Sequence, residues 1–377
     1  MDFEFTEDQT MLRDTVQRFV AREYSFEHRQ KILATPFGFS PDIWRQFAEQ
    51  GVLGTGLPEE HGGFGGPTEI MVVMEELGKG LVLEPFMSTV VIGGGLIRDR
   101  GTAEQQADLL PRIIAGECKM ALAHHEPGAR YVLNHVNTTV SRNGNGYLLS
   151  GSKTVVLDGA VADVLILSAR EGSQGELSLF VVSSSAPELK WTRYRTQDGR
   201  SAADVSFARL PVQHGQRLGE PGAGLGAVEQ AVDQGLAALC AEAVGAMEAV
   251  NEATLQYLRT RKQFGQPIGR FQVLQHRMAD MFLMATQAKS MSYLATGRCR
   301  ETSVAERRHA LSAAKAFVGQ AARFVGQQSV QLHGGMGMSA ELSISHYFKR
   351  LTLINATFGD IDHHVGVLSD QLLAEAQ

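Results

Sequence analysis

Two changes in texture divide this chain of 377 residues into three parts, and their order limits the folds that it can adopt. Residues before 119 and from 225 onward carry apolar side chains at helical spacing, whereas 120–215 consists of short apolar runs between turn formers. An alternating series of strands and helices would have indicated a parallel, nucleotide-binding sheet. The order in this chain predicts an α+β protein with an N-terminal α-helical domain at 1–118, a central β domain at 119–224 and a C-terminal four-helix bundle at 225–377.

Capping residues mark the starts of several expected helices. Thr6 and Gln9 have the spacing of a capping box, in which each side chain bonds the other residue's backbone N–H. Ser40 is followed by proline, which is favoured at the first helical position. Ser303 and Glu306 can cap a long helix in the last part of the chain.

Turn residues mark other boundaries. The Asn-Gly-Asn-Gly run at 143–146 indicates a β-hairpin. The Gly/Pro-rich residues 218–224 separate the β domain from the helices that follow. A last helix is expected at about 361–376, and four long helices joined by short loops indicate an antiparallel bundle.

Composition excludes several classes of protein. The formal net charge of -6 gives no reason to expect a nucleic-acid partner. No apolar run has the ~18 residues that span a membrane, and the acidic N-terminus lacks the pattern of a signal peptide. The three cysteines, Cys118, Cys240 and Cys299, have neither the spacing of a disulfide framework nor that of metal ligands. The histidine pairs at 124/125 and 363/364 are not a metal signature either. We therefore expect a cytoplasmic protein without a metal site.

Two segments in the last third of the chain are hard to explain by packing alone. Residues 261–272 include Arg-Lys-Gln-Phe-Gly-Gln-Pro-Ile-Gly between two expected helices, and residues 331–337 read Gln-Leu-His-Gly-Gly-Met-Gly after a third. A Gly-Gly-x-Gly loop exposes backbone N–H groups to a ligand, and an arginine nearby suits a pyrophosphate because its fork pairs two oxygens. Taken singly, the loop could be a turn, Phe264 a core residue and Arg261 part of a solvated face.

At this spacing and on this architecture, the two segments resemble the acyl-CoA dehydrogenase family. The likeness runs along the whole chain, since further segments fall in family order at 57–66, 75–78, 126–128, 151–153 and 218–224. The resemblance implies a three-domain subunit, a tetramer, and FAD held across a subunit interface. It also implies an acyl-CoA substrate of fatty acid β-oxidation and an electron-transfer flavoprotein as electron acceptor.

The resemblance carries particular roles to particular residues. Arg261 would reach the FAD pyrophosphate of a neighbouring subunit, and Phe264 would pack on the flavin or adenine side. The remaining residues with an implied FAD contact are Gln272, Gln331, Gly334 and Gly335. A cation, an aromatic face and exposed amides suit a dinucleotide in kind.

The catalytic base is missing from the positions where the family usually carries it. In most members a glutamate before the final helix removes the α-proton, and Phe358 stands there; other members place it on the first bundle helix, where this chain has Gly235. A positioned base contributes roughly 10²–10⁴ in rate. Two carboxylates are conceivable substitutes. Glu242 lies about two turns beyond Gly235, where a structural partner is the competing interpretation, and Asp360 could instead cap the last helix.

The β domain departs from the family as well. Residues 125–130 replace a Thr-Glu-Pro-Gly-x-Gly-Ser segment whose hydroxyls contact the flavin, and residues 155–157 read Val-Val-Leu where a Trp-Ile-Thr triplet often covers the flavin ring. The sequence therefore keeps the ADP side of the site and loses features of the isoalloxazine side.

Within the family, the chain most resembles the small subunit of bacterial two-subunit dehydrogenases for pimeloyl-CoA. The leading hypothesis is a base-lacking subunit of a hetero-tetramer that forms a trans-2-enoyl-CoA, with a glutamate-bearing paralogue as partner. The alternatives are a homo-tetramer active through Asp360 or Glu242, a non-catalytic FAD- or CoA-binding scaffold or regulatory protein, and an acyl-CoA oxidase.

Overall fold

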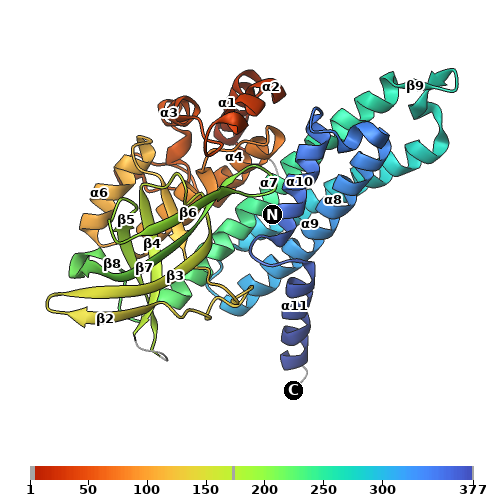
Figure 1. Ribbon diagram of the computed structural model, residues 1–377. Coiled ribbons are helices and arrows are strands. Elements are labelled where there is room, and N and C mark those ends of the chain that lie inside the picture. Colours follow the sequence, from red (N-terminus) through yellow and green to blue (C-terminus); the bar gives the residue numbers. More distant parts are fainter. Residues whose placement is uncertain (1–4, 172–174, 376–377) are drawn as a thin grey trace. The chain divides into compact units, whose positions relative to one another are not determined.

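The structure is a computed structural model that describes residues 5–171 and 175–375. It contains two compact units, each treated separately below (Figure 1). The bundle unit comprises the chain up to Arg29, Pro67–Val82 and everything from Leu236 on; the sheet unit comprises Gln30–Gly66 and Leu83–Gly235. None of the described helices is long and apolar enough to cross a membrane.

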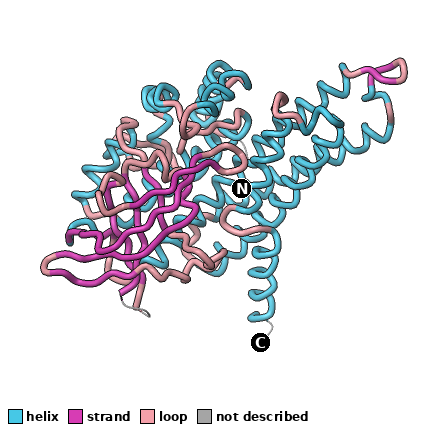
Figure 2. Tube along the Cα trace, viewed as in Figure 1, coloured by secondary structure: helices cyan, strands magenta, loops and turns pink. Residues whose placement is uncertain are grey.

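One mixed β-sheet forms the core of the sheet unit (Figure 2). Its path runs β6-β7-β3-β2-β4-β5-β8, and β1 pairs with β4 in parallel. The strands are β1 (Met120–Ala123), β2 (Thr139–Asn143), β3 (Gly146–Leu157), β4 (Val164–Glu171), β5 (Leu177–Ser183), β6 (Lys190–Arg195), β7 (Ser201–Gln213) and β8 (Arg217–Leu218). The predicted hairpin is confirmed, since Asn143 pairs with Gly146 across a two-residue turn. Strand β1 and the polar edge strand β6 were not predicted from the sequence.

Short helices complete the sheet unit. They are α3 (Pro41–Glu49), the single turns η1 (Val52–Gly54) and η2 (Glu59–His61), η3 (Met87–Gly94), α5 (Gly95–Arg100), α6 (Ala103–Ile114) and the turn η4 (His214–Gln216). The predicted cap of α3 is confirmed, because the Ser40 side chain accepts from the Ile43 N–H. The apolar η3 lies against β1, where the Met120 N–H donates to Thr89 Oγ1 at 3.1 Å.

The bundle unit consists of helices. They are α1 (Glu7–Glu23), α4 (Pro67–Lys79), α8 (Gln272–Arg298), α9 (Val304–His333), α10 (Ser343–Ala356) and α11 (Ile361–Glu375), with the turns η5 (Ile268–Arg270) and η6 (Gly334–Met338). Helices α2 (Phe26–Ala34) and α7 (Gly224–Thr260) belong partly to each unit. The Thr6–Gln9 capping box and the Ser303 cap are confirmed, whereas α10 was not expected from the sequence.

Close helix contact explains one of the quoted segments. A Cβ on Gly78 of α4 would collide with the Glu242 carbonyl of α7, and one on Gly245 would collide with the Glu75 carbonyl. The glycines therefore let the two backbones touch, as small residues do where helices approach closely. The stretch at 75–78 is thus required by packing in the bundle unit.

Candidate functional site: an exposed arm, a glycine loop and two filled base positions

The segment between α7 and α8, residues 261–271, forms an exposed arm. Strands β9 (Lys262–Gln263) and β10 (Gln266–Pro267) pair as a hairpin at the far end of the two helices (Figure 1). Phe264 and Gly265 form its turn with φ of 54° and 77°, the positive pair of a type I′ turn. A phenylalanine rarely adopts this conformation, and its ring is 90% exposed. The arm therefore holds an aromatic ring out in solvent.

The guanidinium of Arg261 lies at the root of this arm and is available to a ligand. The Arg261 N–H donates to Tyr257 O at 2.8 Å, and its carbonyl accepts from the Ile268 N–H at 2.8 Å, so its backbone is held at both sides. The side chains of Arg261 and Gln272 are both exposed. Within the described part of the chain, no carboxylate lies at ion-pair distance from Arg261.

The second segment forms a glycine loop, residues 334–338, at the end of α9. Gly334 has φ of 60° and closes the helix by donating its N–H to Gln331 O. Cβ atoms built on Gly334 and Gly335 would meet nothing within 4 Å, whereas one on Gly337 would lie 2.5 Å from Val330 O. The first two glycines thus face open space, and the third is required by packing. Gln331 is exposed beside them.

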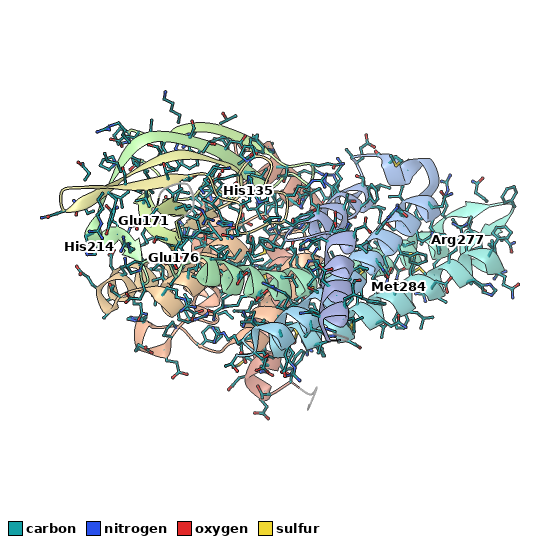
Figure 3. All side chains as sticks on the ribbon, turned by 90° about the horizontal axis from the view of Figure 1, so that it is seen from below. His135, Glu171, Glu176, His214, Arg277 and Met284 are labelled. Atoms are coloured by element: carbon teal, nitrogen blue, oxygen red, sulfur yellow. The ribbon has the colours of Figure 1, made fainter. Side chains whose placement is uncertain are left out.

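Direct contacts bring the arm and the glycine loop to the same end of the bundle unit. The rings of Tyr257 and His333 stack with centroids 4.3 Å apart and planes at 27°. Nearby, Arg277 of α8 donates to Gln328 Oε1 of α9 at 3.1 Å (Figure 3). A free cation, an exposed aromatic ring and a glycine loop with an open face therefore share one region, and such a combination suits a pyrophosphate.

Phe358 occupies the loop between α10 and α11, in a strained conformation with φ of 58°. Asp360 is engaged as a helix cap, because its Oδ1 accepts from the His363 N–H at 2.9 Å. The structure therefore gives Asp360 the competing role that the sequence suggested, at the start of α11. A carboxylate that caps a helix is less free to move toward a substrate.

Two buried groups hold the backbone of this loop. Lys315 Nζ donates to Asn355 O at 2.8 Å and to Gly359 O at 2.6 Å, while His364 Nε2 lies 3.1 Å from Phe358 O. Burial lowers the pKa of Lys315 to about 8, and it lowers the pKa of His364 to about 3. The loop is therefore rigidly shaped even though its central side chain cannot carry a proton.

Glu242 is fully buried in a two-pronged ion pair. Arg350 donates Nε to Glu242 Oε1 at 2.7 Å and its NH2 to Oε2 at 2.6 Å. The Glu242 side chain is 0% exposed and that of Arg350 is 8% exposed. Paired fork-to-fork bonds are among the strong hydrogen bonds of proteins, and here they fix the carboxylate in place. Glu242 therefore serves α7 and α10 as a structural partner.

In the sheet unit, two further quoted segments prove to be joined. Lys153 Nζ lies 2.7 Å from Glu126 Oε1, and both side chains are buried. The Glu126 carboxylate also accepts from the Asn137 and Thr138 N–H groups at 2.6 and 3.0 Å. Although burial opposes it, Lys153 with these donors lowers the pKa of Glu126 to about 2. The sequence named both segments, but no local signal could reveal that they form one clamp 27 residues apart.

The Val-Val-Leu segment contains a bulge with an exposed tip. Val155 has φ of 49° and is 45% exposed, although β-branched residues seldom adopt this conformation. Asp204 Oδ1 stabilises it by accepting from the Val155 N–H at 2.9 Å, from Thr154 Oγ1 and from the Tyr194 hydroxyl. This side of the structure offers an apolar surface where the family pattern has hydroxyl and indole groups.

Comparison with known proteins agrees over the full chain. Models of the N-terminal, middle and C-terminal domains of acyl-CoA dehydrogenase match residues 6–117, 121–210 and 222–373. The long-chain specific acyl-CoA dehydrogenase of Sus scrofa mitochondria is 30% identical over 91% of this chain and 81% of its own length. The Tcur3481-Tcur3483 steroid ACAD matches with a TM-score of 0.88 and 28% identity, covering 98% of this chain and 99% of that one.

The ChsE4-ChsE5 complex of Mycobacterium tuberculosis likewise gives a TM-score of 0.88 at 25% identity, covering 99% of both chains. The chain belongs to the acyl-CoA dehydrogenase family, a family of FAD-dependent oxidoreductases. The expected α+β fold class is confirmed. The free Arg261 guanidinium and the open face of the glycine loop also fit the pyrophosphate of the family's cofactor.

Proposed function

We propose that this chain is the base-lacking subunit of an FAD-dependent acyl-CoA dehydrogenase, in which a glutamate-bearing paralogue completes the active site. The assembly oxidises an acyl-CoA thioester to a trans-2-enoyl-CoA and passes electrons to an electron-transfer flavoprotein. We further propose that it is a hetero-tetramer akin to two-subunit dehydrogenases for pimeloyl-CoA. The domains of the chain are 1–118, 119–224 and 225–377.

One contrast carries the proposal. The arm and the glycine loop keep exposed, unpaired groups for a dinucleotide, while both base positions hold residues that cannot accept a proton, Phe358 and Gly235. The two carboxylates that could replace the base are already engaged, Glu242 by Arg350 and Asp360 by the start of α11. A subunit that binds cofactor for a partner needs the first feature and not the second.

Each residue of the arm then has a defined task. Arg261 pairs two pyrophosphate oxygens with its fork, and the open side of the glycine loop lets the anion approach the Gly335 N–H. Phe264 offers a ring face for the adenine or flavin side, and Gln331 and Gln272 border the site. FAD supplies the hydride-accepting chemistry when it is bound. This chain contributes binding and orientation, and the partner's glutamate removes the α-proton.

Exposed apolar surface near the arm supports contact with another chain. Helix α8 carries exposed Val273, Phe282 and Leu283. A mostly apolar groove of about 600 Å³ runs beside them between the end of α7 and the start of α8, and Leu258 and Met278 line it. An apolar groove of this size with an exposed aromatic ring at its border is typical of an interaction site.

The paired names of two similar structures, Tcur3481-Tcur3483 and ChsE4-ChsE5, support a hetero-oligomer for this chain. Both structures resemble this chain in sequence about as closely as a relative whose name mentions one protein does. Family members named in pairs therefore occur at this level of sequence identity. The exposed apolar residues of α8 and the groove beside them offer surface for such a partner.

The test is co-expression with glutamate-bearing paralogues from the same genome, followed by anaerobic titration with acyl-CoAs at flavin wavelengths. We expect flavin bands that bleach only in the assembly. Arg261→Gln in this chain should reduce the flavin content, whereas glutamate-to-glutamine in the partner should retain flavin and abolish bleaching. Bleaching by this chain alone would instead favour a homo-tetramer active through Asp360 or Glu242. A colourless protein with every partner would favour a scaffold or regulatory role.

A further inference from the structure

The stacked rings of Tyr257 and His333 lie directly behind the two segments proposed to hold the pyrophosphate. Tyr257 is four residues before Arg261, and the Tyr257 carbonyl accepts a hydrogen bond from the Arg261 N–H at 2.8 Å. His333 is followed at once by Gly334, the first residue of the glycine loop. The stack therefore joins the backbone that carries the cation to the backbone of the glycine loop.

We propose that Tyr257 and His333 are positioning residues that set the separation between the Arg261 guanidinium and the amide of Gly335 in the glycine loop. This inference rests on the proposed function, and it adds two residues that touch neither cofactor nor substrate. A pyrophosphate bound by a fork and by amides needs both sets of donors at one spacing, because displacements of about 1 Å weaken preorganised sites strongly.

His333 is itself held by a hydrogen bond at the edge of its ring. The residue is 5% exposed. Its Nδ1 lies 2.8 Å from Ser329 O, so Nδ1 carries the proton and donates it to this carbonyl. Burial lowers the pKa of His333, which keeps the ring neutral at neutral pH. The ring therefore acts through its flat face and adds no charge of its own to the region of Arg261.

The glycine loop also packs against α9 and α10. Gly334 and Gly335 contact nothing at their open faces, and the loop is fixed by the packing of Gly337 on Val330 and by the His333 ring. On the other side, Arg261 follows the last turn of α7, where the Tyr257 ring is half-buried. Removing one ring should thus free the loop without exposing a large core.

The experiment compares Tyr257→Leu with Tyr257→Phe. Leucine removes the stack but keeps an apolar side chain, whereas phenylalanine keeps the stack and loses only the hydroxyl, which is 3.4 Å from His333 O. Because a stacked aromatic pair stabilises the fold beyond its buried area, its loss should weaken FAD binding by the assembly about three- to tenfold. Amide exchange of residues 334–338 in the chain alone should rise by a similar factor, and the phenylalanine variant should restore both values. His333→Leu provides a second removal of the stack should Tyr257→Leu fold poorly.

Equal FAD affinity and equal exchange in wild type and both stack-free variants would overturn the inference. Faster exchange throughout α7 and α9, with a fall in the thermal midpoint that phenylalanine does not restore, would also overturn it, since that pattern is general destabilisation. Should the wild-type chain take no FAD with any partner, the proposed function fails, and exchange of residues 334–338 alone then decides whether the stack positions the loop.

Discussion

The buried pair between Glu242 and Arg350 gives the sharpest prediction, because it separates a structural role from a catalytic one. Glu242→Gln preserves the side-chain shape but replaces the carboxylate that accepts the Arg350 bonds of 2.6 and 2.7 Å with a neutral amide, beside an arginine side chain that is 8% exposed. Removing one partner of a buried ion pair costs about 3–5 kcal/mol. In a cooperative unit of 150–250 residues this corresponds to a fall of roughly 6–20 °C in the thermal midpoint.

Calorimetry or far-UV circular dichroism with temperature measures this fall, and two comparisons sharpen it. Glu252→Gln changes an exposed carboxylate on the same helix and should alter stability by less than about 0.5 kcal/mol. The double variant Glu242→Met, Arg350→Met should recover much of the loss, because apolar residues of similar volume often replace a buried ion pair at little cost.

The opposite pattern would refute this reasoning. If Glu242→Gln kept the wild-type midpoint while an otherwise active enzyme lost flavin bleaching, Glu242 would be the base and the Arg350 contact would be weak. A double variant that is less stable than either single variant would show that the ion pair contributes net stability. That result contradicts the expectation that apolar residues replace a buried ion pair at little cost.

Three further predictions concern the cofactor segments and the buried histidines. Arg261→Gln should weaken FAD binding by the assembly about 10- to 150-fold, the range for charged hydrogen bonds, and a fluorescence titration measures it. Gly337→Ala should weaken FAD binding and speed local amide exchange because its Cβ would lie 2.5 Å from a backbone carbonyl, whereas Gly335→Ala, facing open space, should leave stability unchanged. Burial lowers the pKa of His124 and His364 to about 3, so the folded chain binds fewer protons than the unfolded chain between that value and about 6.5. Stability should therefore fall as the pH is lowered through that window, by about 2 kcal/mol per histidine at pH 5, and His364→Gln should flatten the slope of thermal midpoint against pH.

Local signals in the sequence were sufficient for much of the fold. Thr6, Ser40 and Ser303 begin helices in the structure as their hydroxyls predicted, because a cap depends on residues only three positions apart. The hairpin at 143–146 followed from its turn residues in the same way. Strand β6 and helix α10 were not predicted from the sequence. Strand β6 is a polar edge strand without clear alternation, and α10 follows directly on a loop that was interpreted as a ligand motif.

The sequence by itself determined which residues lie at the candidate site and which chemistry is absent, because side-chain identity decides what can carry a proton or pair a phosphate. Only the tertiary structure decided how those residues are engaged. Glu242 and Arg350 are 108 positions apart, and Tyr257 and His333 are 76 apart. No spacing rule operates over such separations, since these contacts depend on how whole helices pack. The carboxylate that looked like a spare base thus became a structural partner, and two aromatic residues without a motif became the link between the arm and the glycine loop.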